Sequence, residues 1–137
     1  MSDRLYKYIR TALIIILLII PLFGCQEKEY SFEHGRYVPE DQKGKPYDGP
    51  FILTLHNSAQ NNEQFVVVFM PASSYQPNGE IYRKKTEIVL NGEYMDEEYH
   101  YVFHLVDDNT LEYLKSRSSI PNKDAEWEDG TRLVLDR

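Results

Sequence analysis

Two histidines, His100 and His104, have the four-residue spacing that places a pair of zinc ligands together on an α-helix. The residues around them, however, alternate between apolar and polar types, which is the period of a β-strand. On one face of a strand the two imidazoles lie about 13 Å apart, too far for one metal ion to bind both. We therefore interpret both histidines as solvent-facing and expect no metal site.

The acidic segment Asp124–Gly130, sequence DAEWEDG, has only a superficial likeness to a calcium-binding loop. Its glycine falls at the seventh position instead of the sixth, and no glutamate follows at the twelfth. A second acidic group comprises Glu93 and the stretch 96–98. No buried or apolar residues flank it to separate two carboxyl pKa values for acid–base work. We interpret both acidic segments as solvated surface.

The paired serines at 73–74 and 118–119 lack the Gly-x-Ser-x-Gly setting of a nucleophile and have no convincing histidine partner. The chain also has no glycine-rich phosphate loop. We therefore expect no enzymatic activity and no cofactor. A hydrolase remains the third and weakest alternative, which would need an acid–base pair inside a pocket.

Aromatic residues in polar stretches are the candidates for contact with a partner or ligand, because such rings dominate binding energies. Trp127, the single tryptophan, lies in the polar excursion 116–130. We favour the interpretation that it covers one end of the core, and the alternative is an exposed anchor. Tyr75, in the loop after Pro71, is a weaker candidate of the same kind.

The single cysteine, Cys25, ends an apolar stretch that begins at Thr11. Arg4, Lys7 and Arg10 precede the stretch, and basic residues followed by a short apolar region are typical of a secretory signal peptide. A transmembrane helix is the alternative, but the apolar stretch is shorter than the ~20 residues that cross a bilayer, and Pro21 interrupts it.

The residues Leu22, Phe23, Gly24 and Cys25 resemble the bacterial lipobox. The match departs from the usual pattern at Phe23, where the family has a smaller residue. The resemblance implies that the Cys25 thiol receives a diacylglycerol and acyl chains such as palmitate, and that the peptide is cut before it. Two or more acyl chains give a stable membrane anchor. Residues 1–24 are then a lipoprotein signal peptide, 25–34 a tether and 35–137 one folded domain.

The charge of the expected mature chain is strongly negative. Of 15 basic and 22 acidic residues, the signal peptide removes Arg4, Lys7, Arg10 and Asp3, which leaves 12 and 21 and a net charge of −9. Nucleic acids and anionic lipid headgroups attract a basic face, so we expect no nucleic-acid partner and a domain that stands off an anionic surface.

Short apolar stretches of strand character, separated by turn residues, cover the rest of the chain. We expect strands near 35–38, 51–56, 65–70, 80–90, 93–106, 110–115 and 132–136. Asn91–Gly92 predicts a hairpin turn, and a bulge or break is expected near Lys84–Lys85. Seven or eight strands in sequence order favour an antiparallel meander closed into a small barrel, with a β-sandwich as the alternative.

The turn spacing also resembles that of small exported bacterial domains with a lipocalin-like meander. The residues that carry the resemblance are 73–80, the expected hairpin around Asn91–Gly92, the stretch Tyr101–Pro121 and the stretch 129–131. The resemblance implies an all-β barrel over residues 35–137, preceded by the signal helix, and brings no functional residues. Gly35–Arg36–Tyr37 stands where true lipocalins have Gly-x-Trp.

Two functions follow as hypotheses. The first is a lipoprotein of the cell membrane, on its extracytoplasmic face, that holds a small ligand at one end of its barrel. The alternative is a protein-interaction or accessory lipoprotein with a solid core and a working surface in its loops. A barrel of about eight strands can be filled by side chains or can hold one small ligand.

Overall fold

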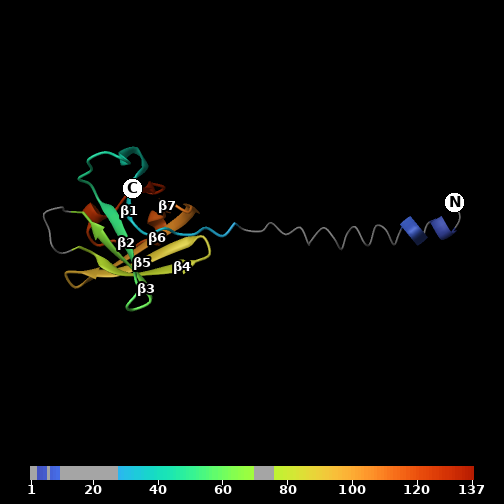
Figure 1. Ribbon diagram of the computed structural model, residues 1–137, viewed down its shortest axis with the longest axis horizontal. Coiled ribbons are helices and arrows are strands. Elements are labelled where there is room, and N and C mark those ends of the chain that lie inside the picture. The colour runs from blue at the N-terminus through green and yellow to red at the C-terminus, as the bar shows by residue number, and fades with distance from the viewer. Residues whose placement is uncertain (1–2, 6, 10–27, 70–75) are drawn as a thin grey trace.

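A computed structural model describes residues 3–5, 7–9, 28–69 and 76–137 (Figure 1). Residues 3–5 and 7–9 are helical, and eight strands form one closed antiparallel barrel in the order β1 to β8. The predicted all-β meander and its closure into a barrel are confirmed, and the β-sandwich alternative is wrong. No helix in the described ranges is long and apolar enough to cross a membrane.

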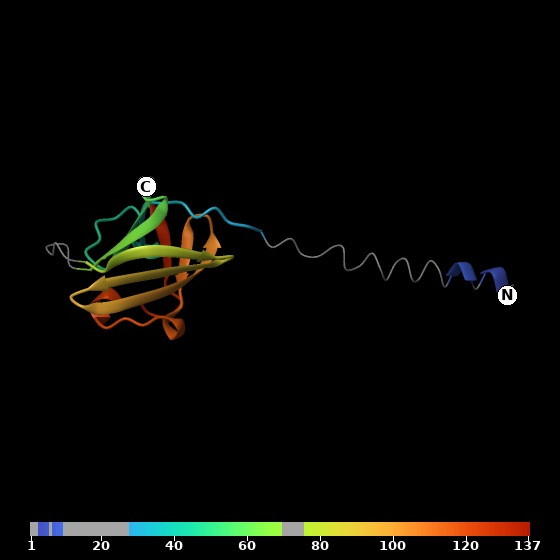
Figure 2. The ribbon, with the colours of Figure 1, turned by 90° about the horizontal axis from the view of Figure 1, so that it is seen from below.

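The strands follow one another around the barrel and leave no edge, because β1 pairs with both β2 and β8. They are β1 (Arg36–Pro39), β2 (Phe51–Asn57), β3 (Asn62–Val68), β4 (Asn78–Lys84), β5 (Glu87–Tyr94), β6 (Glu97–Asp107), β7 (Thr110–Tyr113) and β8 (Arg132–Asp136). Short 3₁₀ turns are η2 (Glu40–Gln42), η3 (Lys115–Arg117) and η4 (Lys123–Ala125). Figure 2 shows the long pair β5–β6 lying across the barrel.

Side chains alternate between the interior and the outer surface, as the sequence pattern predicts. On β6 the interior face carries Tyr99, Tyr101, Phe103 and Leu105, each at most 1% exposed. This is the apolar face expected from the sequence, and it forms the centre of the core.

On β2 the alternation buries the less apolar of the two faces. Ile52 and Thr54 point inward, whereas Leu53 and Leu55 are 39% and 44% exposed. Thr54 is satisfied inside because its hydroxyl bonds both the amide and the carbonyl of Gly35. The outer surface of β2 therefore carries apolar side chains that the barrel core does not use.

Asn91–Gly92 does not form a hairpin turn, so that prediction is wrong: both residues lie inside β5. Gly92 pairs with Gly79 on β4. A Cβ on Gly79 would lie 1.9 Å from the carbonyl oxygen of Asn91, and one on Gly92 would lie 2.8 Å from the ring of Phe65. The two glycines are thus required by close strand packing over an aromatic side chain.

The turns that flank β5 lie elsewhere. The expected break near Lys84–Lys85 is the β4–β5 turn, where Lys85 has φ +52°. The β5–β6 turn is formed by Met95 and Asp96, with φ values of +51° and +63°. Two non-glycine residues in the left-handed region have the backbone signs of a type I′ hairpin.

The two ends of the barrel are closed by segments outside the strands. Residues Ser31–His34, here called the strap, cover the end at which β4 meets β5, and we call this the strap end (Figure 1). The expected tether 25–34 therefore contributes to the fold, because Phe32 is only 3% exposed and belongs to the core. The excursion 114–131 closes the opposite end with Trp127, and we call this the Trp127 end.

Candidate binding surface

The barrel interior is filled by aromatic rings and offers little room in its centre. These rings are at most 6% exposed and comprise Phe32, Tyr37, Phe65, Phe69, Tyr99, Tyr101, Phe103, Tyr113 and Trp127. Among the rings from Phe65 through Tyr101 to Trp127, neighbouring ring centroids lie 5.4 to 6.4 Å apart, the range of favourable aromatic contacts.

Trp127 lies inside this network. It is 5% exposed, contacts the rings of Tyr101, Phe103 and Tyr113, and donates a hydrogen bond from Nε1 to the carbonyl oxygen of Pro50 at 3.1 Å. The placement agrees with a tryptophan that covers one end of the core. As a contact for a partner, Trp127 would have to leave this position.

The other sequence-predicted site residues fall outside the described ranges. They are the lipidation residue Cys25, the lipobox residues Leu22, Phe23 and Gly24, and the candidate contact Tyr75. Their roles stay predictions.

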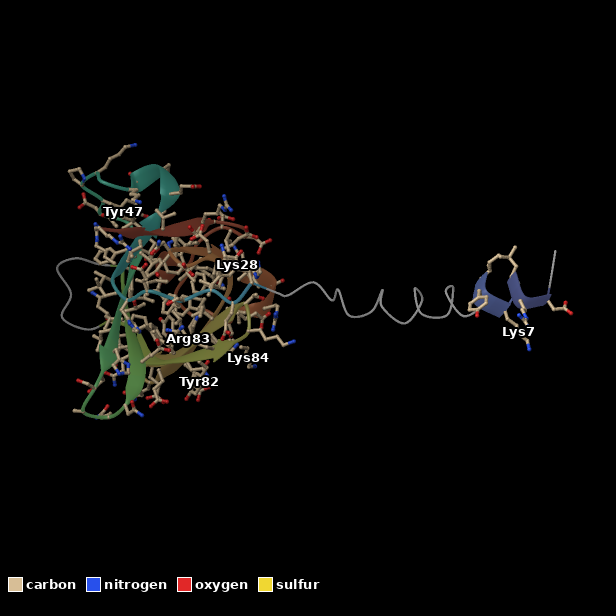
Figure 3. All side chains as sticks on the ribbon, turned by 45° about the vertical axis from the view of Figure 1, so that its right-hand side comes forward. Lys7, Lys28, Tyr47, Tyr82, Arg83 and Lys84 are labelled. Atoms are coloured by element: carbon tan, nitrogen blue, oxygen red, sulfur yellow. The ribbon has the colours of Figure 1, made fainter. Side chains whose placement is uncertain are left out.

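A groove of about 860 Å³ lies on the outer surface of β4, β5 and β6. Outward side chains of these three strands line it: Asn78, Glu80, Tyr82, Asn91, Glu93, Glu98 and His100. Tyr82, labelled in Figure 3, lies on the outer surface and is 46% exposed. Carboxylates, amides, a phenol and an imidazole thus face one shallow hollow that contains neither lysine nor arginine.

Hydrogen bonds orient several side chains of the groove. The Tyr82 hydroxyl donates to Glu80 Oε2 at 2.6 Å, and this bond raises the pKa of the phenol. Asn62 donates from Nδ2 to the other Glu80 oxygen at 3.3 Å. His100 Nδ1 lies 2.5 Å from Asn91 Oδ1. The groove is therefore a preorganised polar surface.

Glu93 and Glu98 are directly opposite one another across the β5–β6 ladder. Within the described part of the chain, neither carboxylate has a lysine, arginine or histidine within 4 Å. Like charges in this position destabilise a sheet. The sequence identified these acidic residues as solvated surface, and the structure adds that they share one groove with Glu80.

A second hollow of about 550 Å³ continues from the groove around the β5–β6 turn. It shares Asn78 and Glu93 with the groove and adds Gln76, Tyr94, Met95 and Asp96. Met95 is 76% exposed, and the Tyr94 ring packs edge-on against Phe69. This hollow offers apolar contacts next to the acidic groove.

A charged cluster at the strap end was missed by the sequence analysis. Arg83 donates to both oxygens of Glu63, at 2.7 and 2.5 Å, and His34 Nε2 lies 2.7 Å from Glu63 Oε1. Arg83 also bonds the carbonyl oxygen of Phe32 at 3.1 Å. The Arg83 hydrogen bonds hold the pKa of Glu63 below its usual value. Because every member pairs with another, we interpret this cluster as a clamp on the strap.

His100 and His104 both lie on β6, as the alternation predicts, where they pair with Asn91 and Glu87 respectively. In the described ranges, no three His, Cys, Asp or Glu side chains are grouped closely enough to hold a metal ion. The histidines have separate surroundings on the outer surface.

Comparisons of the chain with models of protein families, with curated proteins and with solved structures find no match. The fold and the outer surface are therefore the observations from which a function has to be argued.

Proposed function

We propose that this protein is a lipid-anchored β-barrel module of the cell envelope that binds a partner protein on its outer surface and catalyses no reaction. The anchor is the lipid on Cys25, on the extracytoplasmic face of the cell membrane. Its support is the sequence: basic residues, an apolar stretch and a lipobox-like end at the only cysteine.

The contrast between the interior and the outer surface carries the binding part of the proposal. Rings at most 6% exposed occupy the interior, while a groove of about 860 Å³ crosses the outside of three strands. A small barrel filled by side chains has no room for a central ligand. An accessory module with a solid core, the alternative considered from the sequence, fits this distribution better than a ligand carrier.

The chemistry of the groove indicates what kind of partner it accepts. Glu80, Glu93 and Glu98 provide three carboxylates, and Asn78 and Asn91 provide amide donors and acceptors. Electrostatic complementarity favours a partner segment that carries lysine or arginine. The cross-strand repulsion between Glu93 and Glu98 would be relieved when such a segment binds.

The anchor is tested by Cys25→Ala in the native host. We expect the variant to lose metabolic labelling with a fatty acid and to be processed differently from the wild-type protein. If the variant is labelled and processed like the wild type, the lipoprotein assignment is wrong, whatever the barrel binds.

The working surface is tested by photo-crosslinking in cells, with a crosslinking amino acid at Glu93 or at Arg132. Arg132 begins β8, outside the groove, and its side chain is 46% exposed, so it serves as the control. We expect a discrete protein adduct from position 93 that is weakened by Glu98→Lys. Equal adducts from both positions, or adducts unaffected by Glu98→Lys, would contradict the groove as the binding surface.

A small ligand at the barrel end is the second candidate function, favoured by the hollow beside Tyr94 and Met95. Native mass spectrometry of the protein purified from its host would detect a retained small molecule. A bound mass that Met95→Glu removes would support this candidate, whereas an empty protein in repeated preparations would exclude it in favour of the partner-binding function.

A further inference from the structure

Three exposed lysines, Lys28, Lys84 and Lys85, lie together at the strap end of an otherwise acidic domain. Lys28 and Lys85 line one hollow of about 190 Å³ with Glu29 and Thr86, and Lys84 is the last residue of β4. Figure 3 labels Lys28 and Lys84 at the same end of the barrel, away from Tyr47. We call the three lysines the root patch, because Lys28 is close in sequence to Cys25.

Three carboxylates at the strap end form ion pairs with arginines: Glu63 with Arg83, Glu87 with Arg117, and Glu33 with Arg137. Asp107 and Asp108 accept hydrogen bonds from backbone amides, which do not neutralise a carboxylate. Among the described residues, only the exposed Glu29 adds an unpaired carboxylate to this hollow, and no carboxylate lies within 4 Å of any of the three ammonium groups.

We propose that the root patch binds the phosphate groups of anionic lipids in the membrane that carries the anchor, and thereby sets the orientation of the barrel. This inference rests on the lipid anchor of the proposed function. Lys28 follows the expected lipidated cysteine by three residues, so the strap end is the part of the barrel nearest the bilayer. Lysines near an anionic surface are attracted within a Debye length.

The proposal reverses part of the expectation from net charge. A domain of net charge −9 is repelled by an anionic surface as a whole, yet its charges are unevenly distributed. Lys28, Lys84 and Lys85 lie at the strap end, whereas Glu93 and Glu98 lie at the far ends of β5 and β6. Attraction at one end and repulsion at the other both turn the strap end toward the lipid. The acidic groove then faces away from the anchor membrane.

The experiment uses the full-length lipoprotein, purified and reconstituted into vesicles of phosphatidylcholine with or without phosphatidylglycerol. Because lipidation consumes the only native thiol, an introduced cysteine provides a single labelling site. A fluorophore is placed at Thr86→Cys, beside the root patch, or at Met95→Cys, in the β5–β6 turn at the other end. A quencher attached to lipid headgroups reports which probe lies near the surface.

We expect stronger quenching at position 86 than at position 95 in phosphatidylglycerol vesicles, and loss of this difference in phosphatidylcholine vesicles or at high salt. The substitutions Lys84→Glu and Lys85→Glu together should abolish the difference. Lys43→Glu with Lys45→Glu changes the net charge equally in a separate loop and should preserve it. Circular dichroism checks that each variant is folded.

Equal quenching at both positions, a difference that does not require phosphatidylglycerol, or equal loss in both double variants would overturn the orientation proposal. Flotation with the vesicles separates this failure from failure of the proposed function. A protein that floats but shows no preferred orientation retains its lipid anchor, whereas a protein that carries no lipid and does not float lacks the anchor itself.

Discussion

The two ends of the barrel are closed by different kinds of interaction. At the strap end, Phe32 enters the core under a clamp of charged and polar groups, of which Arg83 and Glu63 are the centre. At the Trp127 end, aromatic rings pack against one another, and Trp127 donates a partly buried hydrogen bond to Pro50. The strap end should therefore respond to acid pH through Glu63, and the Trp127 end to loss of volume and to alkaline pH through the buried Tyr101.

The largest effect is expected from Trp127→Ala, which removes the ring that three other aromatic side chains contact. Large aromatic-to-alanine changes in a core cost about 3–5 kcal/mol of unfolding free energy. Urea unfolding followed by circular dichroism measures this value. Trp127→Phe keeps most of the volume and should cost much less. A loss below about 1 kcal/mol for the alanine variant would show that the Trp127 end is not closed by packing.

Phe32→Ala should lower the unfolding free energy by a somewhat smaller amount, about 3 kcal/mol. The Phe32 ring is buried, but it belongs to the short strap outside the strands. Hydrogen exchange should show the loss concentrated in β1, whose Tyr37 ring stacks on Phe32 at 5.5 Å. Phe32→Leu is the control that retains an apolar plug. Unchanged exchange in β1 would contradict the role of the strap as part of the fold.

At alkaline pH the Trp127 end should be tested by Tyr101→Phe. Burial raises the pKa of the Tyr101 hydroxyl far above its usual value of 10.0. The neutral Tyr101 hydroxyl therefore makes its full contribution to stability below pH 10. This contribution is lost as the pH rises above 10, because the Tyr101 hydroxyl ionises in the unfolded state before it does in the folded state. The Tyr101→Phe variant loses the hydrogen bond to the Ala125 carbonyl oxygen, which costs about 1 kcal/mol of unfolding free energy at neutral pH. Its unfolding free energy should then fall less steeply above pH 10 than that of the wild-type protein.

Stability curves from pH 7 to 11 measure this difference. Tyr30→Phe, which removes a hydroxyl from a partly buried ring outside the barrel strands, is the control and should keep the wild-type slope. Parallel declines of wild type and Tyr101→Phe would show that this hydroxyl does not govern alkaline unfolding.

The smallest change in unfolding free energy is expected from Glu63→Gln at the strap end. The Arg83 hydrogen bonds lower the pKa of Glu63 below its usual value of 4.5. The Glu63 carboxylate thus contributes to stability above pH 4.5, and this contribution is lost as the pH falls below that value. Because the Arg83 side chain is 39% exposed, solvent screening keeps the loss near or below about 1 kcal/mol.

Thermal unfolding between pH 3 and 7 should show a flatter acid decline for Glu63→Gln than for the wild-type protein. Glu112→Gln is the control, since Glu112 lies 4.0 Å from Arg132 with both side chains exposed. If the unfolding temperatures of both variants fall with pH as that of the wild-type protein does, the charge of Glu63 in the clamp does not contribute to stability.

Local alternation allowed much of the barrel to be predicted from the sequence. The interior face of β6 and the turn at Lys84–Lys85 both follow from residues adjacent in the chain. Asn91–Gly92 misled the prediction because the same two residues suit a type I′ turn and a close strand contact. The pairing of Gly92 with Gly79 on β4 and the Phe65 ring against Gly92, which no local pattern encodes, accompany the strand conformation.

The clamp and the groove depend on contacts that no local pattern encodes. His34 and Glu63 are separated by 29 residues, and Glu63 and Arg83 by 20. The acidic residues of the groove are recognisable as a charged stretch, but their alignment with Glu80 depends on the β4–β5–β6 register. The turn at Met95–Asp96 sets the β5–β6 register, and the turn between Lys84 and Glu87 sets the β4–β5 register, so both turns are needed to bring these residues together.

The pairing of β1 with β8 bears on the order in which the strands of the barrel associate. Arg36 pairs with Asp136, and the two side chains bond across a separation of 100 residues at 2.6 Å. Strand β8 therefore completes the sheet that β1 begins, and without this pairing the barrel would be an open sheet with two free edges. Ring closure therefore joins strands far apart in the chain, and pairings of this kind form late because the entropy of closing a long loop has to be overcome first.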